Sequence, residues 1–229
     1  MSLYGLFYRL FIIVTGLIPY RALYQIGKLM GWIFYLTPNK HKRISLENLN
    51  LVFPELTSKE LNKLLRESLF HSSMNILECG MVWGSKKYIK DRQFIEVRNF
   101  DLIKNSISQN NGVLLFTPHL GNIEILINYL GSEFETTIPY TKPKNSSLDK
   151  VITKSRNDAG VKMVPADARG IRKILSGLKE KKLVAIASDQ VPKKGNGSFS
   201  KFFHKEIYSM TLLPKLQEKT DCKVHLMYC

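Results

Sequence analysis

Apolar residues dominate the first 36 positions of the chain. The segment LYGLFYRLFIIVTGLIPYRALYQIGKLMGWIFYL is rich in Leu, Ile, Phe and Tyr, and Pro19 divides it into two parts. Its longest strongly apolar run, Leu10 to Ile18, is much shorter than the roughly 20 residues that span a bilayer. A cleavable signal peptide is not indicated either, because no small-residue cleavage site follows the run. We therefore expect a pair of helices in this segment.

Basic residues indicate where these two helices lie. Arg9, Arg21 and Lys28 interrupt the apolar run, and aromatic residues accompany them. Helices that combine apolar, basic and aromatic residues lie in the membrane interface, with their charges at headgroup level. We expect residues 1–37 to be a membrane-associated helical segment. A helical pair packed on the protein's own core is one alternative, and a tilted span over residues 3–19 is another.

A clear helix signal follows a short break. Pro38 to Arg43 is a break with a basic cluster, which would lie among anionic headgroups or form a solvated charge run. Thr57 to Glu60 then has the Ser/Thr-x-x-Glu form of a capping box, and leucines follow it at helical spacing. The pattern predicts a helix from about Ser58 to Cys79.

From residue 93 onwards, short apolar runs alternate with amphipathic stretches. The predicted strands are 94–97, 112–117, 136–141, 161–165, 183–188 and 223–228, and the predicted helices are 102–110, 122–131, about 147–158, 168–179 and about 210–220, the last preceded by a loop with glycine and serine. Continuous apolar strands separated by helices indicate an α/β fold: a largely parallel central sheet with helices on both faces. Residues 38–229 therefore form one predicted α/β domain. No covering helix follows its last strand, so we expect the domain to be incomplete at its C-terminal end.

The charge of the chain limits its partners. Lys and Arg number 34 against 19 Asp and Glu, for a formal charge of +15. Such an excess points to nucleic acid, an acidic carrier protein or a membrane surface. Nucleic-acid binders interleave aromatic with basic residues, whereas here the aromatic residues gather in the N-terminal segment. The three cysteines show no CxxC or Cys/His spacing, so neither a disulfide framework nor a zinc site is indicated.

One histidine has a position suited to chemistry. Of five histidines, only His119 directly follows a predicted buried strand and precedes a helix, and ligands of α/β sheets bind beyond the carboxyl ends of strands. Glu124 falls in the first helical turn, where the Gly121-Asn122 turn can fold its carboxylate back towards the imidazole. Glu124 would then orient one ring nitrogen, while the other acts as general base towards a substrate hydroxyl. Backbone N–H groups at the helix start would stabilise the oxyanion. An incidental histidine is the alternative.

The sequence lacks the motifs of two other reaction types. The chain has no G-x-S-x-G elbow, which argues against a nucleophilic serine. It also has no Walker A and no G-x-G-x-x-G loop, so nucleotide chemistry is unsupported.

The string FTPHLGNIE resembles the His-x4-Asp/Glu block of the lysophospholipid acyltransferase superfamily. It is similar in particular to the bacterial lipid A biosynthesis acyltransferases, the lauroyl and myristoyl transferases. Further blocks that resemble this family are Arg43…Asn48-Leu49…Phe53-Pro54-Glu55, Arg156 with Gly160, Asp189-Gln190 and Phe202-Phe203. Two positions depart from its pattern: Ile123 stands where tryptophan is common, and His204 where glycine is common.

The resemblance implies roles for particular residues. It makes His119 and Glu124 the catalytic pair, and Arg156 a substrate-contacting group that holds a phosphate or helps to polarise the carbonyl. Asn122 and Asp189 join Arg156 as candidate substrate-binding residues. Asp189 would orient the site from the end of its strand. A surface arginine on a helix and a turn-forming aspartate are the alternatives for Arg156 and Asp189.

The resemblance also implies an activity. We expect an acyltransferase that moves a fatty acyl chain from acyl carrier protein to a hydroxyl of a phosphorylated glycolipid, a lipid A precursor. It would act at the cytoplasmic face of the bacterial inner membrane, on an anionic surface, without a metal or other cofactor and without nucleic acid. A same-superfamily enzyme acting on a lysophospholipid or another glycolipid is one alternative. A non-catalytic basic membrane-binding protein is the other.

Overall fold

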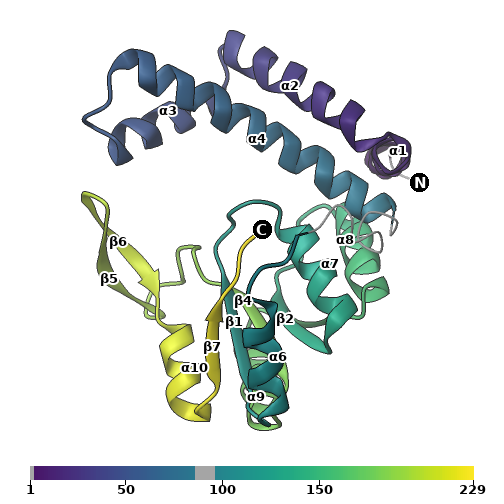
Figure 1. Cartoon of the computed structure of the whole chain (residues 1–229), viewed down its shortest axis with the longest axis vertical. Helices are drawn as coiled ribbons and strands as arrows, with labels where there is room; N and C mark the ends of the chain where they lie inside the picture. The colour runs from purple at the N-terminus through teal and green to yellow at the C-terminus, as the bar shows by residue number, and fades with distance from the viewer. Residues whose placement is uncertain (1–2, 86–95) are drawn as a thin grey trace.

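The computed structural model describes residues 3–85 and 96–229. A layer of helices lies across one end of an α/β domain, at the carboxyl ends of its strands (Figure 1). The helical layer consists of α1 (Leu3–Leu17), α2 (Tyr20–Leu36), α3 (Lys40–Val52) and α4 (Ser58–Gly84). The N-terminal pair of helices and the helix after residue 57 are thus confirmed, and α4 runs five residues beyond the predicted end.

The long helix α4 organises this layer. Its N-terminus is fixed by the predicted capping box, in which the Thr57 hydroxyl accepts from the Glu60 N–H and the Glu60 carboxylate accepts from the Thr57 N–H. Both α1 and α2 pack along it, around an apolar cluster that includes Leu23, Met74 and Leu77. The helical pair is therefore packed on the protein itself, as the alternative expectation held.

The N-terminal helices still expose a large apolar surface. Phe7, Leu10 and Trp32 are each about 60% exposed, and several other aliphatic residues of α1 and α2 are also uncovered. Within the described residues, no helix combines the length and the apolar character needed to cross a membrane. The tilted span is therefore not supported, and the membrane association of these helices stays an expectation.

Helix α3 was not predicted. Asn39 caps it by accepting from the Lys42 N–H at 2.9 Å, but none of its residues is buried. Because α3 buries no residue, it needs no apolar stripe along one face. The 3.6-residue repeat of apolar residues that identifies other helices is therefore weak in its sequence. The basic residues of the segment 38–43, Lys40 to Arg43, form the first turn of this helix.

The α/β domain contains a five-stranded sheet in the order β3-β2-β4-β1-β7, with all described pairings parallel. Its strands are β1 (Val113–Thr117), β2 (Thr136–Tyr140), β3 (Lys162–Pro165), β4 (Leu183–Ala187) and β7 (Lys223–Leu226). These confirm the predicted parallel sheet. The expected strand at 94–97 is not confirmed: residues 94 and 95 lie outside the described residues, and Glu96 and Val97 belong to no strand.

Helices cover both faces of this sheet. Val113 and Leu115 of β1 pack with α6 and α7, whereas Leu114 between them packs with α9 and α10 on the other face. The helices of the domain are α6 (Phe100–Ser108), α7 (Ile123–Glu133), α8 (Ser146–Asp158), α9 (Ala168–Lys179) and α10 (Leu212–Thr220). The alternation follows from the period of two in a strand, and it confirms the layer arrangement predicted from the apolar runs.

A two-stranded antiparallel hairpin replaces the loop expected before α10. It consists of β5 (Gly197–Phe202) and β6 (Lys205–Met210), and it projects from the domain towards α3 (Figure 1). The prediction of a loop was wrong because neither strand is a continuous apolar run and neither packs into the core, so the burial pattern that identifies the other strands is missing.

The contact of α2 with α4 depends on a residue without a side chain. A Cβ atom added to Gly31 would lie 2.7 Å from Cα and 2.9 Å from N of Phe70, both backbone atoms of α4. We predict that Gly31→Ala lowers the free energy of unfolding by about 1–3 kcal/mol, measured by urea denaturation followed by circular dichroism.

Gly177→Ala in α9 is the matched control. Apart from the adjacent backbone of α9, no atom of the described residues lies within 4 Å of a Cβ at that position. The substitution should therefore stabilise the protein by about 0.5–1 kcal/mol through helix propensity. Equal effects of the two substitutions would contradict close packing at Gly31.

Candidate active site

The turn after β1 places His119 at the carboxyl end of the sheet, beneath α4. Gly121 in this turn has φ +71°, and the Asn75 side-chain amide of α4 donates to its carbonyl at 2.9 Å. A Cβ at Gly121 would overlap the backbone carbonyl of Cys229, which follows β7. The turn is therefore enclosed between α4 and the segment after β7, and only glycine fits its tightest point.

His119 is held by Asp189, which follows β4. The carboxylate of Asp189 accepts the backbone N–H of His119 at 2.8 Å through one oxygen, and it contacts Nδ1 of the ring at 2.8 Å through the other. Strands β1 and β4 are adjacent and parallel, so the residues after them meet at the same edge of the sheet. The carboxylate that contacts the imidazole is thus Asp189, and its role in orienting the site stays a prediction.

The electrostatics of this pair leave one ring nitrogen free to act. Burial raises the pKa of Asp189, but the hydrogen bonds from His119 and its charge outweigh that effect, and the pKa lies below its usual value. An ionised carboxylate only accepts hydrogen bonds, so Nδ1 carries a proton and the lone pair of the neutral ring lies on Nε2. The imidazole is 42% exposed, so a substrate can reach it.

Glu124 has different partners from those expected. Its carboxylate accepts from Arg156 Nη2 at 2.6 Å and Nε at 3.4 Å, and from the Trp83 indole N–H at 3.0 Å. The described contacts include none between Glu124 and His119. The expectation that Glu124 orients the imidazole is corrected in this respect, because the guanidinium of α8 is a stronger partner for a buried carboxylate.

The Glu124–Arg156 pair is nearly withdrawn from water. Side-chain exposure is 6% for Glu124 and 11% for Arg156, so the alternative of a surface arginine is wrong. The guanidinium also lies over the Tyr140 ring, at 5.1 Å from its centroid. Burial raises the pKa of Tyr140 to about 12, and the hydrogen bond to Asp149 adds a smaller contribution in the same direction. Trp83 joins this cluster from α4, and no spacing in the sequence connects it with Glu124.

Asn122 is buried and serves as the N-cap of α7. Its side-chain oxygen accepts from the N–H groups of Glu124 at 3.0 Å and Ile125 at 3.2 Å. Its amide donates to the Asn75 carbonyl and the Glu78 carboxylate of α4, each at 3.3 Å. These contacts make Asn122 a capping and bridging residue. Because these contacts occupy the N–H groups of Glu124 and Ile125, those two groups are not available to an oxyanion.

Among the described residues near this turn, neither the Cys79 thiol nor a cluster of metal ligands offers other chemistry. Burial raises the pKa of the Cys79 thiol to about 12, so at neutral pH it is protonated and is not an activated nucleophile. Among the described residues, no group of three His, Cys, Asp or Glu is placed to hold a metal ion.

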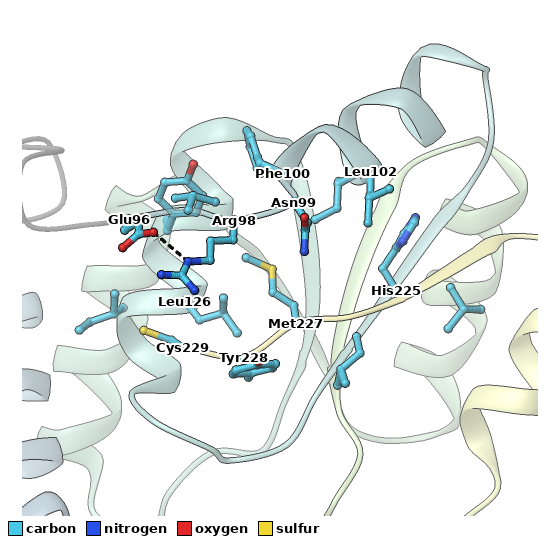
Figure 2. A pocket seen from close by; sticks show the side chains of 16 residues that line it. Glu96, Arg98, Asn99, Phe100, Leu102, Leu126, His225, Met227, Tyr228 and Cys229 are labelled. Atoms are coloured by element: carbon cyan, nitrogen blue, oxygen red, sulfur yellow. Dashed lines mark hydrogen bonds and ion pairs between the residues drawn. The ribbon is translucent and has the colours of Figure 1, made fainter.

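A cavity of about 870 Å³ lies beside the turn, between α6, α7 and β7 (Figure 2). Its lining is largely apolar and includes Phe100, Leu126 and Met227, with the ion pair of Arg98 and Glu96 at 2.8 Å among its polar members. Cys229 also lines it, and this residue contacts the turn after His119. Cys229 therefore links the cavity to the turn, whereas neither His119 nor Asp189 is among the residues that line it.

A parallel sheet with a carboxylate-held histidine beyond its strand ends places the protein in the class of α/β proteins with a ligand site at that edge. Within that class, the chain belongs to the bacterial lipid A biosynthesis acyltransferase family, whose model matches residues 3–229. The resemblance noted from FTPHLGNIE and the surrounding blocks is thereby confirmed.

Curated relatives include three lipid A biosynthesis enzymes. The palmitoleoyltransferase of Escherichia coli K12 is 26% identical over 194 residues, covering 85% of this chain and 62% of the relative. The lipid A biosynthesis acyltransferase of Haemophilus influenzae is 28% identical over 189 residues, covering 81% and 59%. The lauroyltransferase of E. coli K12 is 25% identical over 175 residues, covering 75% and 55%. The chain therefore spans about three fifths of the length of these relatives.

The buried ion pair makes a prediction about stability. Glu124→Ala leaves the Arg156 guanidinium buried without its carboxylate, and we expect the free energy of unfolding to fall by about 3–5 kcal/mol. The double variant Glu124→Met/Arg156→Leu removes both charges and should lose less than the single variant. Urea denaturation of the three proteins checks this, and a single variant as stable as the wild type would contradict the described pairing.

Proposed function

We propose that the protein transfers a fatty acyl chain from an acyl-thioester to a hydroxyl group of a lipid A precursor. The observation that carries the proposal is the contact of His119 Nδ1 with Asp189 at the carboxyl end of a parallel sheet, in a chain of the lipid A acyltransferase family. The names of the curated relatives, palmitoleoyltransferase and lauroyltransferase, support fatty acyl transfer.

In this mechanism His119 is the general base. Its Nε2 takes the proton of the acceptor hydroxyl while the oxygen attacks the thioester carbonyl carbon. The new C–O bond forms, the C–S bond breaks as the tetrahedral intermediate collapses, and the proton passes from the imidazolium to the departing thiolate. The negative charge of Asp189 stabilises the imidazolium between these steps and keeps Nε2 directed outward.

Glu124 and Arg156 support this site as positioning residues. Their ion pair joins α7 to α8, and the Trp83 indole joins both to α4. The turn that carries His119 lies directly before α7, so a shift of α7 would move the imidazole. Catalysis depends on such placement, since small displacements of reacting groups cost large factors in rate.

The donor, acceptor and location follow from charge and surface. We propose acyl carrier protein, which is acidic, as the donor, since the formal charge of +15 favours an acidic partner. The same excess favours a phosphorylated glycolipid and an anionic membrane. The exposed apolar residues of α1 and α2 support attachment to a membrane surface, which we propose is the cytoplasmic face of the inner membrane.

The cavity beside the turn is our candidate for the acyl chain. Its volume lies within the range of ligand pockets in proteins, and its largely apolar lining matches a hydrocarbon. A chain whose thioester lies at His119 would enter it past Cys229.

The proposed chemistry predicts the outcome of three substitutions. His119→Ala should lower kcat for transfer from acyl carrier protein to a tetraacylated lipid A precursor by about 10²–10⁴-fold, because the general base is lost. Asp189→Asn should also lower kcat strongly while leaving KM less affected, since it removes the charge that orients the ring. His71→Ala, at an exposed histidine of α4, is the matched control and should retain wild-type rates.

The assay uses radiolabelled acyl donor and thin-layer separation of the lipid product. Wild-type rates in folded His119→Ala protein would contradict the general-base role. Transfer to lysophosphatidate, without transfer to the lipid A precursor, would replace the acceptor but keep the chemistry.

The cavity proposal predicts a change in chain-length preference. Met227→Trp should fill part of the cavity and shift the preferred donor towards shorter acyl chains, measured with a series of acyl carrier protein thioesters in competition. Ile171→Trp adds the same bulk at an exposed position on α9 and should leave the preference unchanged. An unaltered preference in active, folded Met227→Trp protein would place the acyl chain elsewhere.

A further inference from the structure

The β5–β6 hairpin carries large apolar side chains that no other described element covers. Residues 198–207 are exposed without interruption, so neither face of the hairpin is packed against the domain. Phe199 is 72% exposed, Phe202 57% and Phe203 56%. An isolated two-stranded hairpin is only marginally stable in water, and a cluster of exposed aromatic residues on a soluble surface marks an interaction site.

The turn of the hairpin has an unusual residue at its tip. Phe203 has φ +50°, in the left-handed region where Gly, Asn and Asp are favoured and a bulky residue is an outlier. Its ring lies edge-on to Phe202, with centroids 4.7 Å apart. An aromatic pair therefore occupies the outermost point of the hairpin, against the local backbone preference. Such strain persists where the side chain serves a purpose beyond the turn itself.

The base of the hairpin, in contrast, is fixed. The Tyr208 hydroxyl accepts the N–H groups of Gly195 at 2.9 Å and Gly197 at 3.0 Å. Thr211 donates to the Asn196 carbonyl through its N–H at 3.3 Å and its hydroxyl at 3.2 Å. The hairpin is thus anchored at the end nearer Asp189, and its aromatic tip projects freely into solvent.

Two lysines flank this tip, and Glu206 is the cross-strand partner of one of them, Lys201. The segment from residue 190 to 211 has four lysines and one glutamate. Lys201 precedes the aromatic pair and Lys205 follows it after His204; in the described part of the chain neither of them forms an ion pair. In a peripheral membrane contact, aromatic rings enter the boundary between headgroups and acyl chains, and neighbouring ammonium groups bind lipid phosphates. The tip has both kinds of group.

We propose that the tip of the β5–β6 hairpin, Phe202 and Phe203 framed by Lys201 and Lys205, inserts into an anionic phospholipid bilayer. This contact is separate from the apolar surfaces of α1 and α2. A bilayer fits the tip better than an acidic protein does, because charge attraction alone does not account for two unpacked phenylalanines at its outermost point. The hairpin begins eight residues after Asp189, so the inserted tip holds the edge of the candidate site at the lipid surface.

Vesicle binding of the full chain tests the insertion directly. We expect Phe202→Ser/Phe203→Ser to weaken partition into phosphatidylethanolamine–phosphatidylglycerol vesicles by about tenfold or more, because two aromatic rings no longer leave water. Ile171→Ser, which removes an exposed apolar residue from α9, should partition as the wild type does. Circular dichroism shows whether each variant is folded. Equal partition of the folded double variant and the wild type would overturn the proposal.

A fluorescent label reports the depth of the tip without removing both rings. Phe203→Cys, in a background with the exposed Cys229 replaced by serine, receives an environment-sensitive dye. Ser198→Cys labels the base as a matched control. The dye at 203, and not at 198, should shift to the blue with anionic vesicles and be quenched by nitroxide-bearing lipids.

A dye at 203 that does not respond to anionic vesicles would overturn the proposal. If that dye responded to acyl carrier protein instead, the hairpin would be a protein-docking element. Neither readout requires acyl transfer, so a failure here is distinct from a failure of the proposed activity.

Discussion

Glu124 and Arg156 form an ion pair that is almost wholly removed from water, and the surrounding architecture depends on it. The pair joins α7 to α8, while the Trp83 indole attaches it to α4 in the helical layer. A buried charge is tolerated only when a partner and further hydrogen bonds accompany it. The pair therefore fixes α4, α7 and α8 relative to one another. Because the turn with His119 directly precedes α7, its position is fixed as well.

The two charged pairs near the turn differ in what their environment allows. His119 and Asp189 are both more than a third exposed, so solvent and substrate can exchange protons with them. Glu124 and Arg156 are shielded from solvent, and each is paired with the other. One pair is suited to proton movement and the other to holding shape. Two carboxylates with different surroundings thus lie around a single turn, and we propose a different role for each.

Sequence patterns captured the parts of the molecule that bury apolar residues. The parallel sheet, its covering helices and α4 were predictable because continuous apolar runs and a capping box mark them. Helix α3 and the β5–β6 hairpin bury little, so neither produces a burial pattern in the sequence. His119 was predictable from its place after a buried strand. The partner of Glu124 was not, because Arg156 is 32 residues away and only the packing of α8 on α7 brings it near.

The close approach of Gly121 to the carbonyl of Cys229 has a consequence for biosynthesis. The strand that leads to Cys229 follows every candidate residue in the sequence, so it emerges from the ribosome after them, and it joins the sheet beside β1. The turn that carries the histidine therefore lacks one of its walls until the end of β7 has been made and docked. A nascent chain that already contains every candidate residue would still have an open, unfinished site, so the site is completed only after β7 has paired with β1.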